Sequence, residues 1–351
     1  MYVAIRATEY VKAHRACTEV ETLDASAWFD EVISFVEAET RPMAILLFNR
    51  YALNLTLNWL CNVRKYSGVH SRVILLSLDR HSFHALEAFQ KRALRPDGPK
   101  LLYAPVVGLS NVEFRHFDGP YQLFQVFRAN LAAAILRRTE GRKAFWLIQA
   151  DTLWFRNLFS FPPLPQGRVP RSIAFDRASS SGSLRYLIAG GYIYVSADAS
   201  PEFFERLAEI LTWWYAPDNA IMVYLCERHY ANTNCQYFDF QLVANWQWFY
   251  ERHPRLPALL QFDNGDDGGG KLRSMQQLGL QFVTEDGSRC SLAAVRRLDR
   301  LTVADLRQRQ SSTRETQLRL FHVFGSRLMS SGISYINARL VLFSYFFCLT
   351  L

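Results

Sequence analysis

The chain has 351 residues, half of them apolar and 14% aromatic, so it can bury a large core and is not a disordered protein. Its formal charge of +8 favours anionic partners such as phosphates, nucleic acid or acidic membrane surfaces. Six cysteines include no C-x-x-C pair, which argues against a zinc knuckle, although Cys226 and Cys235 are candidates for a disulfide in an oxidising compartment.

The first 40 residues predict a helical segment. Charges interrupt the apolar stretch at the start, unlike a signal peptide, and no anchor is visible in this chain. Residues 25–39 place apolar side chains three and four positions apart, the spacing of an amphipathic helix. We therefore expect residues 1–40 to form helices ahead of the main domain.

Compact apolar runs then alternate with helix-like segments. The runs predict strands at 43–48, 72–79, 101–106, 145–151, 172–176 and 190–195. Helices are expected at 50–66, 81–94, 120–138 and 201–214. This alternation predicts an α/β fold with a mainly parallel sheet covered by helices on both faces. Ligands of such sheets bind beyond the carboxyl ends of the strands, where Asp79 and Asp151 end their runs.

The second half of the chain is less regular. No internal repeat or low-complexity linker divides it, so we expect one elaborated domain at 41–327. An apolar tail follows at 328–351, and its apolar run at 338–351 falls short of the roughly 18–20 residues of a membrane span. Arginines between 289 and 319 have few aromatic neighbours, which favours a solvated helical insertion over a nucleic-acid site.

The segment around Asp151 carries the most informative pattern. Hard ions such as Mn²⁺ and Mg²⁺ prefer oxygen ligands, and a diphosphate leaving group needs its charge neutralised. "LIQADTLWFRNL" resembles the nucleotide-diphospho-sugar transferase domain, whose signature reads like D-x-D-x-x-W-x-x-[DN]-P. The match covers Asp151, Trp154 and Asn157, so the motif is DXD-like. Gln149 stands in place of the first acid, and Leu158 in place of the proline.

Other segments resemble the same family in the same order. "LLFNRYALNLTLNWL" is similar to its first strand and helix, with Asn49 at a nucleotide-facing turn, and "VILLSLD" to its second strand, ending on Asp79. "YQLFQVFRANLAAAIL" resembles the helix before the acidic motif, with Arg128 as its basic residue.

Three later segments continue this resemblance, which spans about 41–327. "IAGGYIYVSA" resembles the strand that carries Gly191, with Ala189 in place of an asparagine, and "APDNAIMVYLC" resembles the segment that supplies Asp218. "FHVFGS" resembles a His-x-x-Gly element, in which His322 would complete a metal site and Gly325 would let the backbone approach the diphosphate.

The resemblance implies a Rossmann-like nucleotide-sugar transferase of the Golgi or secretory pathway. Its activity would be transfer of a sugar from a nucleotide diphosphate sugar to a hydroxyl of a glycan or glycoprotein, with no nucleic-acid partner. The metal, Mn²⁺ or Mg²⁺, would be held by Asp151 and His322. Asp218 would be the catalytic candidate on the sugar or acceptor side. The nucleotide sugar would contact Asn49, Asp79, Arg128, Gln149, Asp151, Gly191 and Gly325.

Two other interpretations of the whole chain remain open. One is an RNA- or membrane-binding protein, which would rest only on the basic segment and the apolar tail. Loss of the first acid also fits an inactive relative that binds a glycan or a protein. The segment 265–272, "GDDGGGKL", nearly spells a phosphate-binding loop, but Leu272 occupies the position of the Mg²⁺-binding hydroxyl. Gly265 and Ser274 likewise do not fit a calcium loop. We therefore expect a mobile surface loop there, near the acceptor side.

Overall fold

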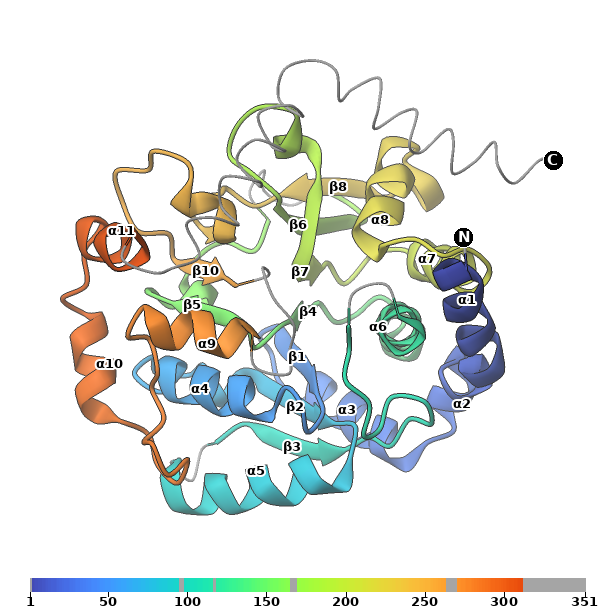
Figure 1. The fold of residues 1–351 in the computed structure, drawn as a ribbon. Helices are drawn as coiled ribbons and strands as arrows, with labels where there is room; N and C mark the ends of the chain where they lie inside the picture. The colour runs from blue at the N-terminus through green and yellow to red at the C-terminus, as the bar shows by residue number, and fades with distance from the viewer. Residues whose placement is uncertain (1, 95–97, 116–117, 165–168, 263–269, 312–351) are drawn as a thin grey trace.

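The structure, a computed structural model, describes residues 2–94, 98–115, 118–164, 169–262 and 270–311. Figure 1 shows a central sheet with helices packed around it. Seven strands form this sheet in the order β3-β2-β1-β4-β7-β6-β8. The strands are β1 Met43–Phe48, β2 Val73–Ser77, β3 Lys100–Tyr103, β4 Phe145–Ile148, β6 Ser172–Arg177, β7 Ile188–Val195 and β8 Asn234–Tyr237.

The sheet is mainly parallel, as predicted. β3, β2, β1 and β4 run parallel to one another, and β6 pairs in parallel with β8. β7 is antiparallel to both of its neighbours, β4 and β6. The prediction of an α/β, Rossmann-like fold is therefore confirmed, with one reversed strand that the apolar runs did not indicate.

The central strands are apolar on both faces because each face contributes to a different core. Met43 and Ile45 of β1 pack into the core that contains α6 Gly119–Thr139 and α7 Pro201–Trp213. Ala44 and Leu46 pack into the opposite core, with α4 Leu53–Val63 and α5 Arg80–Ala93. Alternate side chains of a strand point to opposite faces, so helices must cover both sides of the sheet.

The N-terminal segment is helical, in agreement with the sequence. Its helices are α1 Tyr2–His14, α2 Val20–Asp24 and α3 Ala27–Ala38. All three contact α6, and Val11, Leu23 and Phe29 are buried in the same core as one face of the sheet. This segment is thus packed onto the domain that follows it.

A second, smaller sheet extends the fold directly after β4. β5 Thr152–Trp154 pairs antiparallel with β10 Leu259–Gln261, which pairs in parallel with β9 Val243–Ala244. The remaining helices of the described ranges are α8 Asp218–Glu227, α9 Gly270–Gln277, α10 Leu292–Leu298 and α11 Val303–Ser311. Within the ranges given above, no helix has the length and apolar character to cross a membrane. The predicted tail, 328–351, lies outside the described residues.

Two disulfides tie the chain together. Cys226 and Cys235 are bonded, as the sequence suggested, and close a loop of nine residues' separation. A second bond, between Cys61 in α4 and Cys290, joins residues 229 positions apart and was not predicted. It connects the C-terminal helices to the first half of the sheet.

We expect the Cys61–Cys290 bond to stabilise the fold more than Cys226–Cys235. Loop-closure entropy removed from the unfolded chain corresponds to about 5 kcal/mol for the long loop and about 3 kcal/mol for the short one. Urea unfolding of the two double alanine variants should show this order, with Cys17→Ala, at a free cysteine, as the control. A larger loss from the short loop would contradict the prediction.

Candidate functional site

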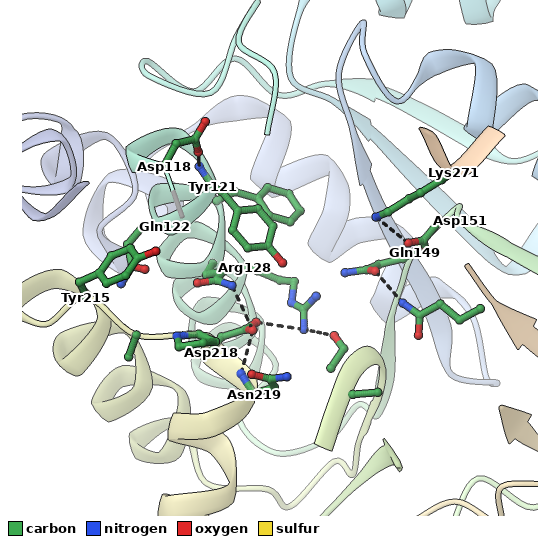
Figure 2. A pocket seen from close by; sticks show the side chains of 17 residues that line it. Asp118, Tyr121, Gln122, Arg128, Gln149, Asp151, Tyr215, Asp218, Asn219 and Lys271 are labelled. Atoms are coloured by element: carbon green, nitrogen blue, oxygen red, sulfur yellow. Dashed lines mark hydrogen bonds and ion pairs between the residues drawn. The ribbon is translucent and has the colours of Figure 1, made fainter. Parts of the chain in front are cut away.

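A cavity of about 240 Å³ opens at the carboxyl end of β4. Figure 2 shows its lining side chains converging from separate parts of the chain. The first half of α6 contributes Arg128, and the link from β4 to β5 contributes Gln149 and Asp151. Asp218 enters from the start of α8, and Lys271 from the first turn of α9. The cavity therefore lies at the sheet edge where the sequence placed a ligand.

Arg128 connects three elements on one side of this cavity. Its guanidinium donates a hydrogen bond to the Gly190 carbonyl of β7 and lies 3.4 Å from an Asp218 oxygen. The other Asp218 oxygen accepts hydrogen bonds from the Gln125 amide, at 3.2 Å, and from the Asn219 backbone N–H, at 2.8 Å. Burial raises the pKa of Asp218, while the adjacent Arg128 charge acts in the opposite direction.

Asp176, at the end of β6, holds β7 in the shape that Arg128 requires. Its buried carboxylate accepts hydrogen bonds from the N–H groups of Gly190, Gly191 and Tyr192, at 2.8 to 3.1 Å. Gly190 has a φ of +87°, a conformation that side-chain-bearing residues rarely adopt. Burial raises the pKa of Asp176 to about 6, against the lowering effect of the three N–H groups. The apolar run at 172–176 predicted β6, but its terminal acid, Asp176, was not assigned a role, although its place at the end of that run was the available signal.

Asp151 is paired with a lysine that the sequence analysis did not assign to the site. The Lys271 ammonium lies 2.8 Å from a carboxylate oxygen of Asp151, and their side chains are only 13% and 4% exposed. The Asp151 carbonyl accepts a hydrogen bond from the N–H of Phe262, which extends the β5–β10 pairing by one residue. The expectation of a surface loop at 265–272 is wrong for Lys271, because this residue lies in the first turn of α9 and lines the cavity. Residues 263–269 lie outside the described ranges.

Gln149, which replaces the first acid of the motif, is held by another amide. Its side-chain oxygen accepts a hydrogen bond from Gln261 Nε2 at 3.0 Å. Gly191 makes room for this pair, because a Cβ at that position would lie 2.2 Å from the same Gln261 nitrogen. Gly190, and not Gly191, lines the cavity.

The other motif residues stabilise the fold around Asp151. Trp154 is fully buried and donates a hydrogen bond from its indole to the Tyr192 hydroxyl at 3.1 Å. The Asn157 side chain accepts a hydrogen bond from the Phe159 N–H at 3.0 Å and so caps a short helical turn. Both residues therefore position the motif loop without lining the cavity.

Two predicted nucleotide-binding residues make other contacts. The Asn49 amide donates to the Val112 carbonyl at 2.7 Å, and Asp79 caps α5 by accepting from the Ser82 N–H at 2.9 Å. Neither lines the cavity. Their roles toward a nucleotide stay predictions, as do those of His322 and Gly325, which lie outside the described residues.

The described part of the site does not fit a divalent cation. Within the described ranges, no three His, Cys, Asp or Glu side chains are grouped to hold one. Asp151 supplies one carboxylate, and its oxygen already faces the Lys271 ammonium at 2.8 Å. At roughly 4 Å and an effective dielectric constant of about 20, the ammonium repels a single positive charge by about 4 kcal/mol and a dication by about twice that. The Mn²⁺ or Mg²⁺ site with His322 therefore stays a prediction.

The raised pKa of Asp176 gives a testable dependence of stability on pH. A folded-state pKa of about 6, above the ordinary 3.8, adds stability below pH 3.8 that is lost as the pH rises through about 6. Relative to Asp176→Asn, the free energy of unfolding of wild type should fall by up to about 3 kcal/mol as the pH rises across that window. Urea unfolding at several pH values measures this, with the surface variant Asp30→Asn as control. A difference that does not change with pH would contradict the assignment.

The nucleotide-diphospho-sugar transferase family matches residues 68–275, and this range contains Arg128, Asp151, Asp176, Asp218 and Lys271. No curated protein sequence matches the chain.

Several solved glycosyltransferases resemble the fold at low identity. GlyE of Streptococcus pneumoniae is 12% identical over 65% of this chain and 56% of its own, with a TM-score of 0.39. The bifunctional glycosyltransferase WbbM is 9% identical over 78% and 52%, with a TM-score of 0.42. The galactosyltransferase LgtC is 10% identical over 69% and 98%, with a TM-score of 0.41. The chain thus spans little more than half the length of GlyE and of WbbM.

The family match covers more than half of the chain and includes both sides of the cavity. The chain belongs to the nucleotide-diphospho-sugar transferase family.

Proposed function

We propose that the protein transfers a sugar from a nucleotide diphosphate sugar to an acceptor hydroxyl, and that the donor binds in the cavity at the end of β4. The observation that carries this proposal is the convergence of Arg128, Gln149, Asp151 and Asp218 in that cavity. These four residues come from separate segments of the matched family domain. Arg128, Gln149 and Asp151 were expected at the nucleotide sugar, and Asp218 on the sugar or acceptor side.

The two sides of the cavity suit the two parts of such a donor. A sugar presents neutral hydroxyl groups, which both donate and accept hydrogen bonds. Asp218, Gln125 and Asn219 offer a carboxylate and two amides on one side. The other side has the motif residues Gln149 and Asp151 together with the cationic Lys271. We therefore place the sugar beside Asp218 and the diphosphate beside the motif.

Asp218 is our candidate for the catalytic carboxylate, with Arg128 as its positioning residue. The ion pair and the Asn219 N–H fix the direction of the carboxylate, so one acceptor group is presented to the cavity in a defined geometry. A fixed acceptor favours one orientation of a sugar, which is how positioned groups lower a reaction barrier. No separate observation favours the alternative of an inactive glycan- or protein-binding relative.

The proposed acceptor is a glycan or glycoprotein in the Golgi or another part of the secretory pathway. This rests on the family resemblance and is supported by the disulfides Cys61–Cys290 and Cys226–Cys235. Disulfides of this kind persist in oxidising compartments and are rare in the cytosol.

A thermal-shift panel of nucleotide sugars tests donor binding. At least one donor should raise the melting temperature, because a ligand at 100 times its Kd adds about 2.7 kcal/mol to the stability of the folded state. If none of the UDP- and GDP-linked sugars shifts the transition, with or without Mn²⁺, the proposed function is wrong.

Asp218→Asn separates sugar recognition from nucleotide recognition. The variant should bind the nucleotide sugar roughly tenfold more weakly, by loss of a charged hydrogen bond, and should bind the parent nucleoside diphosphate as wild type does. Calorimetry with both ligands measures this, with Asp30→Asn as the matched control. Equal weakening of both ligands would remove Asp218 from the sugar side.

A further inference from the structure

The charges around Asp151 assign a role to Lys271. We propose that the Lys271 ammonium holds the diphosphate of the donor in the place of a divalent cation, so that this chain binds its donor without metal. The inference rests on the proposed function, because it names the group that recognises the diphosphate in the same cavity.

The position of Lys271 is the first observation. Figure 2 shows its side chain pointing toward Asp151 beside Gln149, on the motif side of the cavity, with Arg128 and Asp218 on the other side. The ammonium lies 2.8 Å from an Asp151 oxygen, and both side chains line the cavity. Lys271 therefore occupies the surroundings in which a metal bound to Asp151 would lie.

The chemistry of the motif is the second observation. Gln149 is neutral and its amide oxygen accepts a hydrogen bond from Gln261, so it adds no negative charge that would attract a metal. Asp151 is the one carboxylate of the motif, and a single carboxylate next to an ammonium has no net charge with which to hold a dication. The replacement of the first acid and the presence of Lys271 thus change the site in the same direction.

An ammonium is suited to the task that the site requires. It is a compact charge with three N–H donors, which lets it contact a carboxylate and phosphate oxygens together. Among the charged lining residues, Arg128 is engaged by Asp218 and by the Gly190 carbonyl, away from the motif. Lys271 is the lining cation on the motif side, and Asp151 becomes its positioning residue.

A different role for Lys271 has to be separated from this one. In that role Lys271 only neutralises Asp151, a nearly buried carboxylate whose isolation would destabilise the fold. Removing the two charges together distinguishes the roles. The double variant Asp151→Asn/Lys271→Gln removes both charges of this pair, so it is expected to fold even where Lys271→Gln alone does not.

The experiment is calorimetric titration of the full chain with UDP and with GDP, each in EDTA and in Mn²⁺. Wild type should bind one of them with the same Kd in both conditions. Lys271→Gln and the double variant should bind it roughly 10- to 100-fold more weakly in EDTA, the loss expected for a charged hydrogen bond. Lys91→Gln, which removes a surface lysine paired with Glu87, is the matched control and should bind as wild type does.

Each outcome decides the inference. Wild-type binding that disappears in EDTA would overturn it and leave the proposed function standing. A double variant that binds as tightly as wild type would show that Lys271 only neutralises Asp151. Binding of neither nucleotide, in EDTA or in Mn²⁺, would overturn the inference together with the proposed function.

Discussion

The site depends on the hydrogen bonds that the Asp176 carboxylate accepts from β7. This carboxylate accepts hydrogen bonds from three successive backbone N–H groups of β7 and so fixes the bend at Gly190, where φ is +87°. That bend presents the Gly190 carbonyl to Arg128, and Arg128 in turn holds Asp218. A buried carboxylate is tolerated only when hydrogen bonds or charges satisfy it, and here the peptide groups do so. One acid at a strand end thus orders α6, β7 and α8 around the cavity.

The site combines this rigid half with a motif half whose charge differs from the family signature. In the rigid half, Arg128 and Asp218 form a buried ion pair. In the motif half, Lys271 and Asp151 form another. Pairing these two carboxylates with cations lowers the free-energy cost of burying their charge. It also leaves the cavity suited to a ligand that brings its own negative charge.

Much of the fold was predictable because its strands are buried on both faces. The apolar runs at 43–48 and 72–79 are continuous and of strand length, too short for an ordinary helix, and the structure confirms both strands. The reversed direction of β7 was not predictable, since direction depends on how distant segments pair and leaves no local pattern. The cavity's position at the end of β4 followed from general sheet geometry.

The site was predictable in part. Arg128, Gln149, Asp151 and Asp218 line the cavity, and their roles toward a donor stay predictions. Asp79 was expected there because it ends a strand. In the structure its carboxylate accepts a hydrogen bond from the Ser82 backbone N–H and so caps α5. The pairing of Lys271 with Asp151 was not predictable, because Asp151 lies 120 positions earlier in the chain and no spacing rule relates the two residues. Sequence patterns identify polar residues at a sheet edge more easily than they tell which of them face a ligand and which face the backbone.

A crystal structure of the chain with its nucleotide sugar would test the central claim most directly. We expect the diphosphate oxygens within roughly 3 Å of Lys271 Nζ, the distance of a charged hydrogen bond, and the sugar within hydrogen-bonding distance of Asp218. A nucleotide sugar bound outside the cavity, or bound in it with the sugar at the motif and the diphosphate beside Asp218, would contradict the account.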